Sequence, residues 1–262
     1  MARIQILNQE IDCDGPSFYR VLVDKQHFKY LTIDPNIYEV DDMCFPPKLL
    51  TLLPPFPAGN WNFGLISKTE EHPTPFFVEM SRKEYASIQP LWHADSYDYL
   101  SFEIGPSLRS NVYVASSPDS KQSVVAKFAR FEWEIGYYVA ETQAYSWIEG
   151  HEIGPKFLGY LTEEGRVMGF LLEKIEGRHA AIEDLSACKT ILKKLHALGI
   201  VHRDLNKHNF LITEQGPVLI DFETAEKSSD TKTMEAELER LESQFLDELG
   251  IGGIAPEDVE EG

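Results

Sequence analysis

The amino-acid sequence predicts a mixed α+β fold, and three observations favour that class. β-prone runs recur along most of the chain, for example at residues 17–23 and 124–128. Apolar residues at helical spacing become frequent in the second half, for example at residues 182–198. No supersecondary unit repeats along the chain, which argues against a solenoid or a propeller. Strands and helices in separate parts of the chain are typical of α+β proteins.

The elements follow one another in a clear order. The expected strands are residues 17–23, 27–33, 99–104, 112–116, 124–128, 157–161 and 168–173, with short apolar runs at 209–212 and 218–220. The expected helices are residues 133–149, 182–198 and 232–249. Gly199 stands where a glycine commonly ends a helix. The last helix has one apolar stripe, made of Met234, Leu238, Leu241, Phe245 and Leu249.

The overall charge limits the partners that we expect. The chain has 262 residues with 24 basic and 43 acidic side chains, a net charge of −19. We therefore expect neither nucleic acid nor an anionic membrane as a general partner, because both would be repelled. The first residues contain no apolar run of the signal-peptide kind. The three cysteines, Cys13, Cys44 and Cys188, show no pairing pattern. A cytoplasmic location is expected, with the nucleus left open.

Residues 1–95 form an N-terminal extension whose role the sequence does not settle. Residues 17–23 and 27–33 flank a short polar turn and predict a hairpin. Residues 46–57 contain five prolines, which predicts an extended tether instead of a helix. The extension could be a structural cap or a partner-binding segment, and we favour the cap. Residues 96–250 would form the main domain, and residues 251–262 a disordered acidic tail.

The polar loop after residue 200 carries the chemistry. Residues 200–222 read IVHRDLNKHNFLITEQGPVLIDF, with Asp204 and Asn209 five residues apart and Asp221 after a predicted hairpin. Magnesium prefers oxygen ligands, which Asn209 and Asp221 could supply from two sides of a cleft. Asp204 would then be free to accept the proton of an attacking hydroxyl group.

This segment resembles a known family. HRDLNKHN followed by IDF is similar to the catalytic loop H-R-D-L-x-x-x-N and the metal-binding D-F-G of protein kinases. The resemblance implies a bilobal protein-kinase-like fold that uses ATP and Mg²⁺. It makes Asp204 the catalytic aspartate and gives Asn209 and Asp221 to the metal.

The same resemblance assigns residues upstream. Lys127, in SVVAKFA, takes the place of the strand lysine that binds ATP phosphates, and Glu141 that of its partner on the next helix. Glu141 lies on an inward stripe with Tyr138, Tyr145 and Ile148, whereas Glu134 is a rival for the same role. Residues 172–175 would be the hinge, where Glu173 and Ile175 meet adenine through their backbone groups.

The departures from the kinase pattern bear on function. Gly105 is the single glycine where a glycine-rich loop should cradle phosphate, so phosphate binding would rely on other backbone N–H groups or on Ser107 and Ser110. Glu223 replaces the glycine of D-F-G, and Asn206 stands where Ser/Thr kinases have lysine. The chain that follows Asp221 is short, which predicts a reduced C-terminal lobe.

These features also resemble aminoglycoside- and choline-kinase-like enzymes and small fungal kinase-like proteins. We expect an ATP-dependent phosphotransferase that acts on a small molecule or one dedicated protein. The alternative is a pseudokinase, which would bind nucleotide or a partner without turnover.

Overall fold

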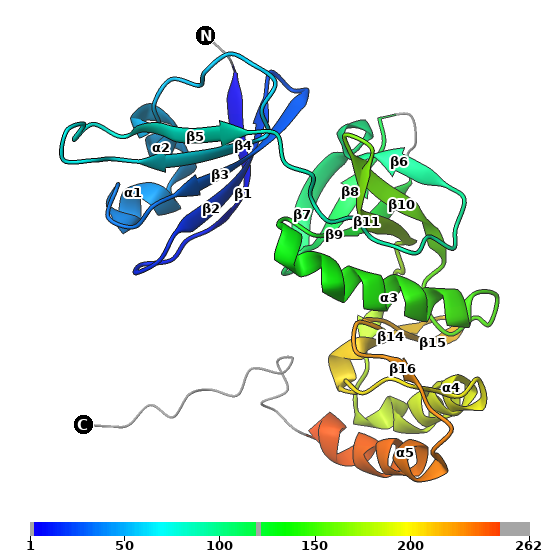
Figure 1. The fold of residues 1–262 in the computed structure, drawn as a ribbon. Helices are drawn as coiled ribbons and strands as arrows, with labels where there is room; N and C mark the ends of the chain where they lie inside the picture. The colour runs from blue at the N-terminus through cyan, green and yellow to red at the C-terminus, as the bar shows by residue number, and fades with distance from the viewer. Residues whose placement is uncertain (1–2, 119–121, 247–262) are drawn as a thin grey trace, which may run out of the picture. The chain divides into compact units, whose positions relative to one another are not determined.

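The computed structural model describes residues 3–118 and 122–246 and confirms the mixed α+β class (Figure 1). The chain divides into two compact units. Within the described residues, unit 1 contains residues 3–87 with 130–132 and 163–166, and unit 2 contains residues 88–118, 122–129, 133–162 and 167–246. The expected acidic tail at 251–262 and the end of the last expected helix at 247–249 lie outside the described residues.

Unit 1 is built on a five-stranded sheet in the order β1-β2-β3-β4-β5. Its strands are β1 (Ile4–Glu10), β2 (Ser17–Val23), β3 (His27–Ile33), β4 (Phe63–Ser67) and β5 (Phe76–Ser81). The predicted hairpin is confirmed, because β2 and β3 pair antiparallel from Ser17 opposite Ile33 to Val23 opposite His27. Asp24 and Lys25 both have positive φ in its turn, the backbone geometry that matches the twist of two-residue hairpins.

The expected extended tether at 46–57 is wrong in its first half. Residues Pro46–Leu52 form helix α2, which follows the short helix α1 (Val40–Cys44). Two of the prolines occupy the first positions of α2. Proline is tolerated there because the N–H groups of the first helical turn have no carbonyl partner within the helix. The other three prolines follow the helix, and Leu49 fills the core of the unit with Tyr19, Ile33 and Trp61.

A buried ion pair belongs to unit 1. The Arg20 guanidinium lies 2.6 Å from Glu163 Oε2, and both side chains are almost fully buried. The Tyr30 hydroxyl donates to the other oxygen of Glu163 at 2.6 Å. Burial would raise the pKa of Glu163, but Arg20, Arg166 and the Tyr30 hydroxyl hold it below its ordinary value. The carboxylate therefore stays charged inside the unit.

Unit 2 begins with a six-stranded sheet in the order β6-β10-β11-β9-β8-β7. Its strands are β6 (Ser96–Asp98), β7 (Glu103–Arg109), β8 (Val112–Ser116), β9 (Ser123–Phe128), β10 (Phe157–Glu163) and β11 (Arg166–Glu173). The expected strand at 99–104 is wrong at its start, because Tyr99–Ser101 forms a 3₁₀ turn, η1, but Glu103 and Ile104 at its end do belong to a strand, β7. The Asp98 side chain accepts a hydrogen bond from the Leu100 N–H at 2.7 Å, and such a cap turns the chain whatever its β propensity.

Helix α3 (Ile135–Ile148) follows the 3₁₀ turn η2 (Glu132–Glu134). The predicted inward stripe is confirmed, since Tyr138, Glu141, Tyr145 and Ile148 are all buried. In Figure 1 the helix runs between the six-stranded sheet and the elements that follow β11.

The remaining elements of unit 2 are short except for two helices. They are β12 (Arg178–His179), η3 (Ile182–Asp184), α4 (Leu185–Ala197), β13 (Ile200–Val201), η4 (Lys207–Asn209), β14 (Phe210–Thr213), β15 (Gly216–Leu219), β16 (Glu226–Lys227) and α5 (Thr231–Leu246). Gly199 has φ +70°, as predicted for the residue that ends α4. Leu241 and Phe245 of the predicted α5 stripe are buried, and Leu238 packs against the same core.

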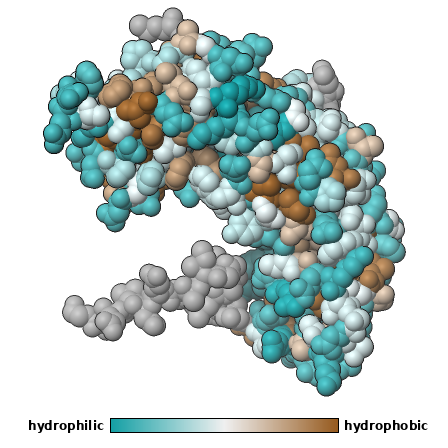
Figure 2. Space-filling view, in the orientation of Figure 1, coloured by the Kyte–Doolittle hydropathy of each residue, from teal (hydrophilic) through white to brown (hydrophobic). Residues whose placement is uncertain are grey.

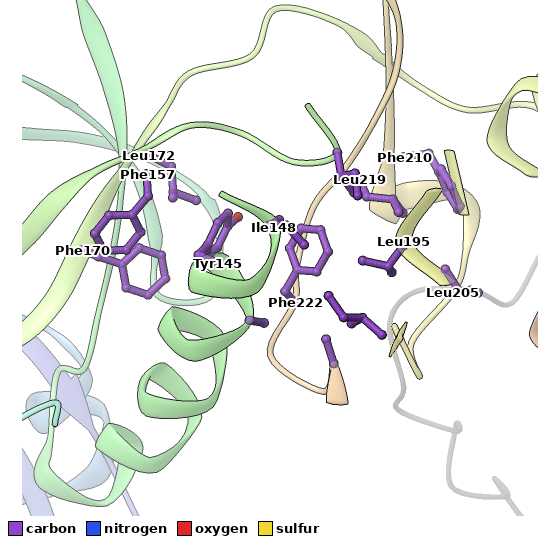
Figure 3. Packing of buried hydrophobic residues seen from close by; sticks show 14 of the residues in the cluster. Tyr145, Ile148, Phe157, Phe170, Leu172, Leu195, Leu205, Phe210, Leu219 and Phe222 are labelled. Carbon is purple, nitrogen blue, oxygen red and sulfur yellow. The ribbon is translucent and has the colours of Figure 1, made fainter. Parts of the chain in front are cut away.

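One apolar core runs through unit 2. Figure 3 shows Phe157, Phe170 and Leu172 of the sheet on one side and Leu195, Leu205, Phe210 and Leu219 on the other. Tyr145 and Phe222 lie between them, with ring centroids 5.4 Å apart. The core therefore joins the sheet and α3 to the segment that carries the HRDLNKHN loop.

Hydrophilic residues cover most of the face shown in Figure 2, with smaller apolar areas between them. Within the described residues, no helix has the length and apolar character needed to cross a membrane.

Candidate active site

The HRDLNKHN loop is held together by its own asparagines. The Asn206 side chain accepts from the His208 N–H at 2.9 Å and starts η4. Asn209 is 1% exposed, and its amide donates to the Asp204 carbonyl oxygen at 2.8 Å and to Asp204 Oδ2 at 3.0 Å. Because a buried amide with two acceptors has little freedom to turn, Asn209 fixes the direction of the Asp204 carboxylate.

Asp221 lies just after β15, and the contacts of the residues on either side fix its position. The Ile220 N–H donates to the Asn209 carbonyl oxygen at 3.0 Å, and His202 Nε2 lies 3.1 Å from the Ile220 carbonyl oxygen. Phe222 is fully buried. Asp221 has φ +67°, a region that residues other than glycine seldom adopt. The contacts on both sides of Asp221 stabilise this conformation and bring its carboxylate to the loop.

Lys127 contacts its expected partner Glu141 and also Asp221. Its Nζ lies 2.7 Å from Glu141 Oε1 and 3.0 Å from Asp221 Oδ1. Burial alone would lower the pKa of Lys127, but the Glu141 and Asp221 carboxylates outweigh it and raise the pKa above its ordinary value. The lysine therefore stays charged. The rival, Glu134, instead accepts a hydrogen bond from the Asn111 amide at 3.0 Å.

Gly169 on β11 makes room for this arrangement. A Cβ at this position would come within 2.3 Å of the Lys127 carbonyl oxygen on the paired strand β9. Only glycine lets the two strands approach so closely beside the lysine.

The sequence did not reveal Arg109, which lies at the end of β7. Its Nη1 lies 3.0 Å from Asp221 Oδ2 and 3.2 Å from Asn209 Oδ1, and its Nη2 donates to the His208 carbonyl oxygen at 2.9 Å. Burial opposes ionisation of Asp221, but Lys127 and then Arg109 hold its pKa below the ordinary value. The sequence signal for Arg109 is its position, because it is a basic residue in the turn where the glycine-rich loop was expected.

A cavity of about 380 Å³ opens beside this cluster. Its lining includes Lys127, Asp221, Glu173 and Ile175, together with the apolar side chains of Val125 and Leu172. Gly105 is not in that lining; it lies exposed in β7, where an added Cβ would stand 3.2 Å from the Val114 carbonyl oxygen.

A larger cavity, about 870 Å³, lies between α4 and the β14–β15 hairpin. Its lining does not contain Lys127, Asp204, Asn209 or Asp221. The smaller cavity is the better candidate for a site because its lining includes the charged groups of Lys127 and Asp221, whereas Asp204 and Asn209 line neither of these two cavities.

A second residue that the sequence did not reveal is Glu237 on α5. It accepts from the Arg203 N–H at 2.7 Å and the His202 N–H at 3.3 Å, and it lies 2.7 Å from His196 Nε2. Burial would raise the pKa of Glu237, but these three contacts hold it below its ordinary value. Arg203 has φ +69°, so Glu237 stabilises a strained point of the loop just before Asp204. The sequence signal for Glu237 was its spacing: it lies four residues before Leu241, and therefore on the same side of the helix as a residue of the apolar stripe.

Known proteins resemble the C-terminal part of this chain. Residues 174–261 match the lipopolysaccharide kinase (Kdo/WaaP) family. A 3-deoxy-D-manno-octulosonic acid kinase of Photobacterium damsela subsp. piscicida is 34% identical over 65 residues, which are 24% of this chain and 27% of that protein. The chain thus spans about a quarter of the length of the curated relative it matches. The resemblance is to kinases.

These kinases belong to the protein-kinase-like superfamily, and the match supports a kinase-like phosphotransferase. The matched stretch contains Asp204, Asn209, Asp221 and Glu237 but not Lys127. The expected similarity to aminoglycoside, choline and fungal kinase-like proteins stays a prediction.

The charge of Glu237 should make its contribution to stability depend on pH. Because its pKa is lowered by folding, the contribution is complete above the pKa of the unfolded chain, about 4.3, and is lost as pH falls through the folded value. We expect Glu237→Gln to lower the free energy of unfolding by about 1–3 kcal/mol at pH 7 and by much less at pH 3.5. Urea unfolding at both pH values measures this.

Glu239→Gln, at an exposed position of the same helix, is the matched control and should change little at either pH. An equal loss for Glu237→Gln at pH 7 and pH 3.5 would contradict a role for the charge.

Proposed function

We propose that this chain is an ATP- and magnesium-dependent phosphotransferase with a bilobal protein-kinase-like fold, formed by residues 96–250 behind a structural cap. It transfers the γ-phosphoryl group to a hydroxyl group of the acceptor. The observation that carries the proposal is the meeting of Asp204, Asn209 and Asp221 with the Lys127–Glu141 pair. These residues come from β9, α3, the HRDLNKHN loop and the segment after β15.

The oxygen atoms of Asn209 and Asp221 suit a hard cation. Both accept from the same nitrogen of Arg109, at 3.2 and 3.0 Å, so they face one point and already share a positive group. Amide and carboxylate oxygens with room for phosphate oxygens are the ligands that magnesium takes in such enzymes. When bound, the ion would neutralise the charge that develops on the transferred group.

The other residues act by position and charge. Lys127 binds the phosphate chain, and Glu141 holds the Lys127 ammonium in place. Asp204 accepts the proton of the acceptor hydroxyl, and the Asn209 amide keeps its carboxylate turned toward the substrate. The apolar walls Val125 and Leu172 suit adenine, which the backbone groups of Glu173 and Ile175 would recognise.

The relative's name favours one kind of acceptor. That protein is named as a kinase of 3-deoxy-D-manno-octulosonic acid, a sugar acid that carries hydroxyl groups. A small hydroxylated acceptor is therefore preferred here over one dedicated protein.

A pseudokinase is the second candidate, and Glu223 favours it. Glu223 stands where the kinase pattern has the glycine of D-F-G, and burial first and the neighbouring Asp221 second raise its pKa. The pseudokinase would bind nucleotide without transfer.

Nucleotide binding gives the test. We expect Asp221→Asn to lose most magnesium-dependent affinity for ATP, about tenfold or more, because it removes a formal charge at the cation. Calorimetry with a non-hydrolysable ATP analogue, with and without magnesium, measures it. Asp14→Asn, at an exposed position of unit 1, should bind like the wild type. Unchanged magnesium-dependent affinity in Asp221→Asn would refute the metal assignment.

A further inference from the structure

The guanidinium of Arg109 lies where the proposed site needs a metal ion. It reaches Asp221 Oδ2, Asn209 Oδ1 and the His208 carbonyl oxygen, all within 3.2 Å. Two of these acceptors are the proposed metal ligands. The Lys127 ammonium occupies the other carboxylate oxygen of Asp221 at 3.0 Å. Both oxygens of Asp221 therefore already face a positive charge.

Contacts in the turn after β7 fix the backbone from which the Arg109 side chain extends. Arg109 pairs with Val112 across the turn, and the Ser107 hydroxyl donates to the Arg109 carbonyl oxygen. Asn111 takes the positive φ of the turn, 61°, and its amide donates to Glu134 Oε1. The backbone on both sides of Arg109 is thus fixed, while the side chain is held only by the three contacts above and is 37% exposed to solvent.

A divalent ion and this guanidinium cannot share the site. With magnesium between Asn209 and Asp221, the ion, Lys127 and Arg109 would crowd one carboxylate with like charges a few ångströms apart. Arg109 would have to leave. The cavity next to it is lined by Leu108, Arg109, Lys127 and Asp221, so the nearest anion to receive it is the phosphate chain of a bound nucleotide. A planar guanidinium binds two phosphate oxygens at once.

We infer that Arg109 is an internal cation with two positions: it holds Asn209 and Asp221 when the site is empty and binds nucleotide phosphate once a metal ion displaces it. The inference rests on the proposed function. It also supplies what the turn between β7 and β8 lacks, because Gly105 alone cannot offer the backbone N–H groups of a glycine-rich loop.

The experiment titrates magnesium alone, and then the magnesium complex of a non-hydrolysable ATP analogue, into wild type and Arg109→Gln by calorimetry. We expect Arg109→Gln to bind magnesium alone about tenfold more tightly, because its competitor is gone, and the nucleotide complex about tenfold more weakly. Arg109→Lys keeps the charge but cannot span three acceptors, so it should change both affinities in the same directions by less.

Arg82→Gln is the matched control, since it removes an arginine of unit 1 that pairs with Glu164, and both its affinities should equal those of the wild type. A magnesium affinity in Arg109→Gln that is unchanged or weaker overturns the inference, and so does an unchanged nucleotide affinity. If Arg109→Gln does not fold, Arg109→Lys decides by the same criteria.

The Asp221→Asn variant distinguishes the proposed function from the role of Arg109. If wild type shows magnesium-dependent nucleotide binding that Asp221→Asn loses, the proposed metal site stands whatever Arg109→Gln does, and turnover then decides between the phosphotransferase and the pseudokinase. If wild type binds neither magnesium nor the nucleotide complex, both the proposed function and the role of Arg109 are wrong.

Discussion

Lys127→Met should reduce phosphoryl transfer by roughly 10²–10³-fold or more, because it removes the buried positive charge that we propose binds the phosphate chain. The ammonium lies within 3.0 Å of both Glu141 and Asp221, and methionine can contact neither carboxylate as a donor. Steady-state ADP formation in wild type and variant measures the loss. Glu141→Gln should be milder, since it disturbs the position of Lys127 and leaves its charge.

The same change has a cost in stability. Glu141 is 1% exposed, and burial raises its pKa to about 7. Lys127→Met removes the cation that favours its charged form, which costs up to about 3–5 kcal/mol. The double variant Lys127→Met/Glu141→Gln removes that buried charge and should recover much of the free energy of unfolding while staying inactive. The double variant therefore separates the loss of activity from the loss of stability.

Glu134→Gln is the matched control on the neighbouring turn, because Glu134 contacts Asn111 instead of Lys127. It should retain most activity. An inactive Glu134→Gln with an active Glu141→Gln would mean that the functional partner of Lys127 is not the one in the structure.

Local sequence signals predicted the parts of the site that depend on spacing. Asp204 and Asn209 are five residues apart in one loop, so their hydrogen bond follows from local geometry. Glu141 was expected to face inward because its helical stripe is otherwise apolar. A charged side chain on an apolar stripe needs an oppositely charged partner, and few residues of the chain can be that partner.

The sequence signals for Arg109 and Glu237 are too weak to single them out, for a physical reason. Arg109 meets Asn209 and Asp221 from 100 and 112 residues away in the chain, and a single arginine beside a turn has no periodicity that reveals its direction. Glu237 sits on a helix with many other acidic residues. Which of them turns toward the loop depends on how α5 packs, and its sequence alone leaves that open.

The errors in the fold have equally local causes. Prolines were taken as helix breakers, but Pro46 and Pro47 occupy the first turn of α2, where proline is tolerated. The run at 99–104 is β-prone, yet the Asp98 cap bends it into η1. In unit 1, the parallel pairing of β3 with β4 joins strands separated by two helices, and hydrophobic pattern alone does not indicate such a pairing.

The most direct test of the central claim is magnesium-dependent ADP formation by wild type and Asp204→Asn. Acceptors should include sugar acids and other small hydroxylated compounds, with casein and myelin basic protein as generic proteins. Asparagine keeps the size of Asp204 but cannot accept a proton, so the rate should fall about 10²–10⁴-fold. Binding of the nucleotide analogue should persist, because Asp204 is not a proposed metal ligand.

We predict that wild type turns over ATP with at least one small acceptor, that chelating magnesium stops the reaction, and that the generic proteins take up no phosphate. Two results would contradict the account. Turnover that Asp204→Asn leaves unchanged would place the chemistry elsewhere in the molecule. Nucleotide binding by wild type without turnover on any acceptor would make the protein a pseudokinase.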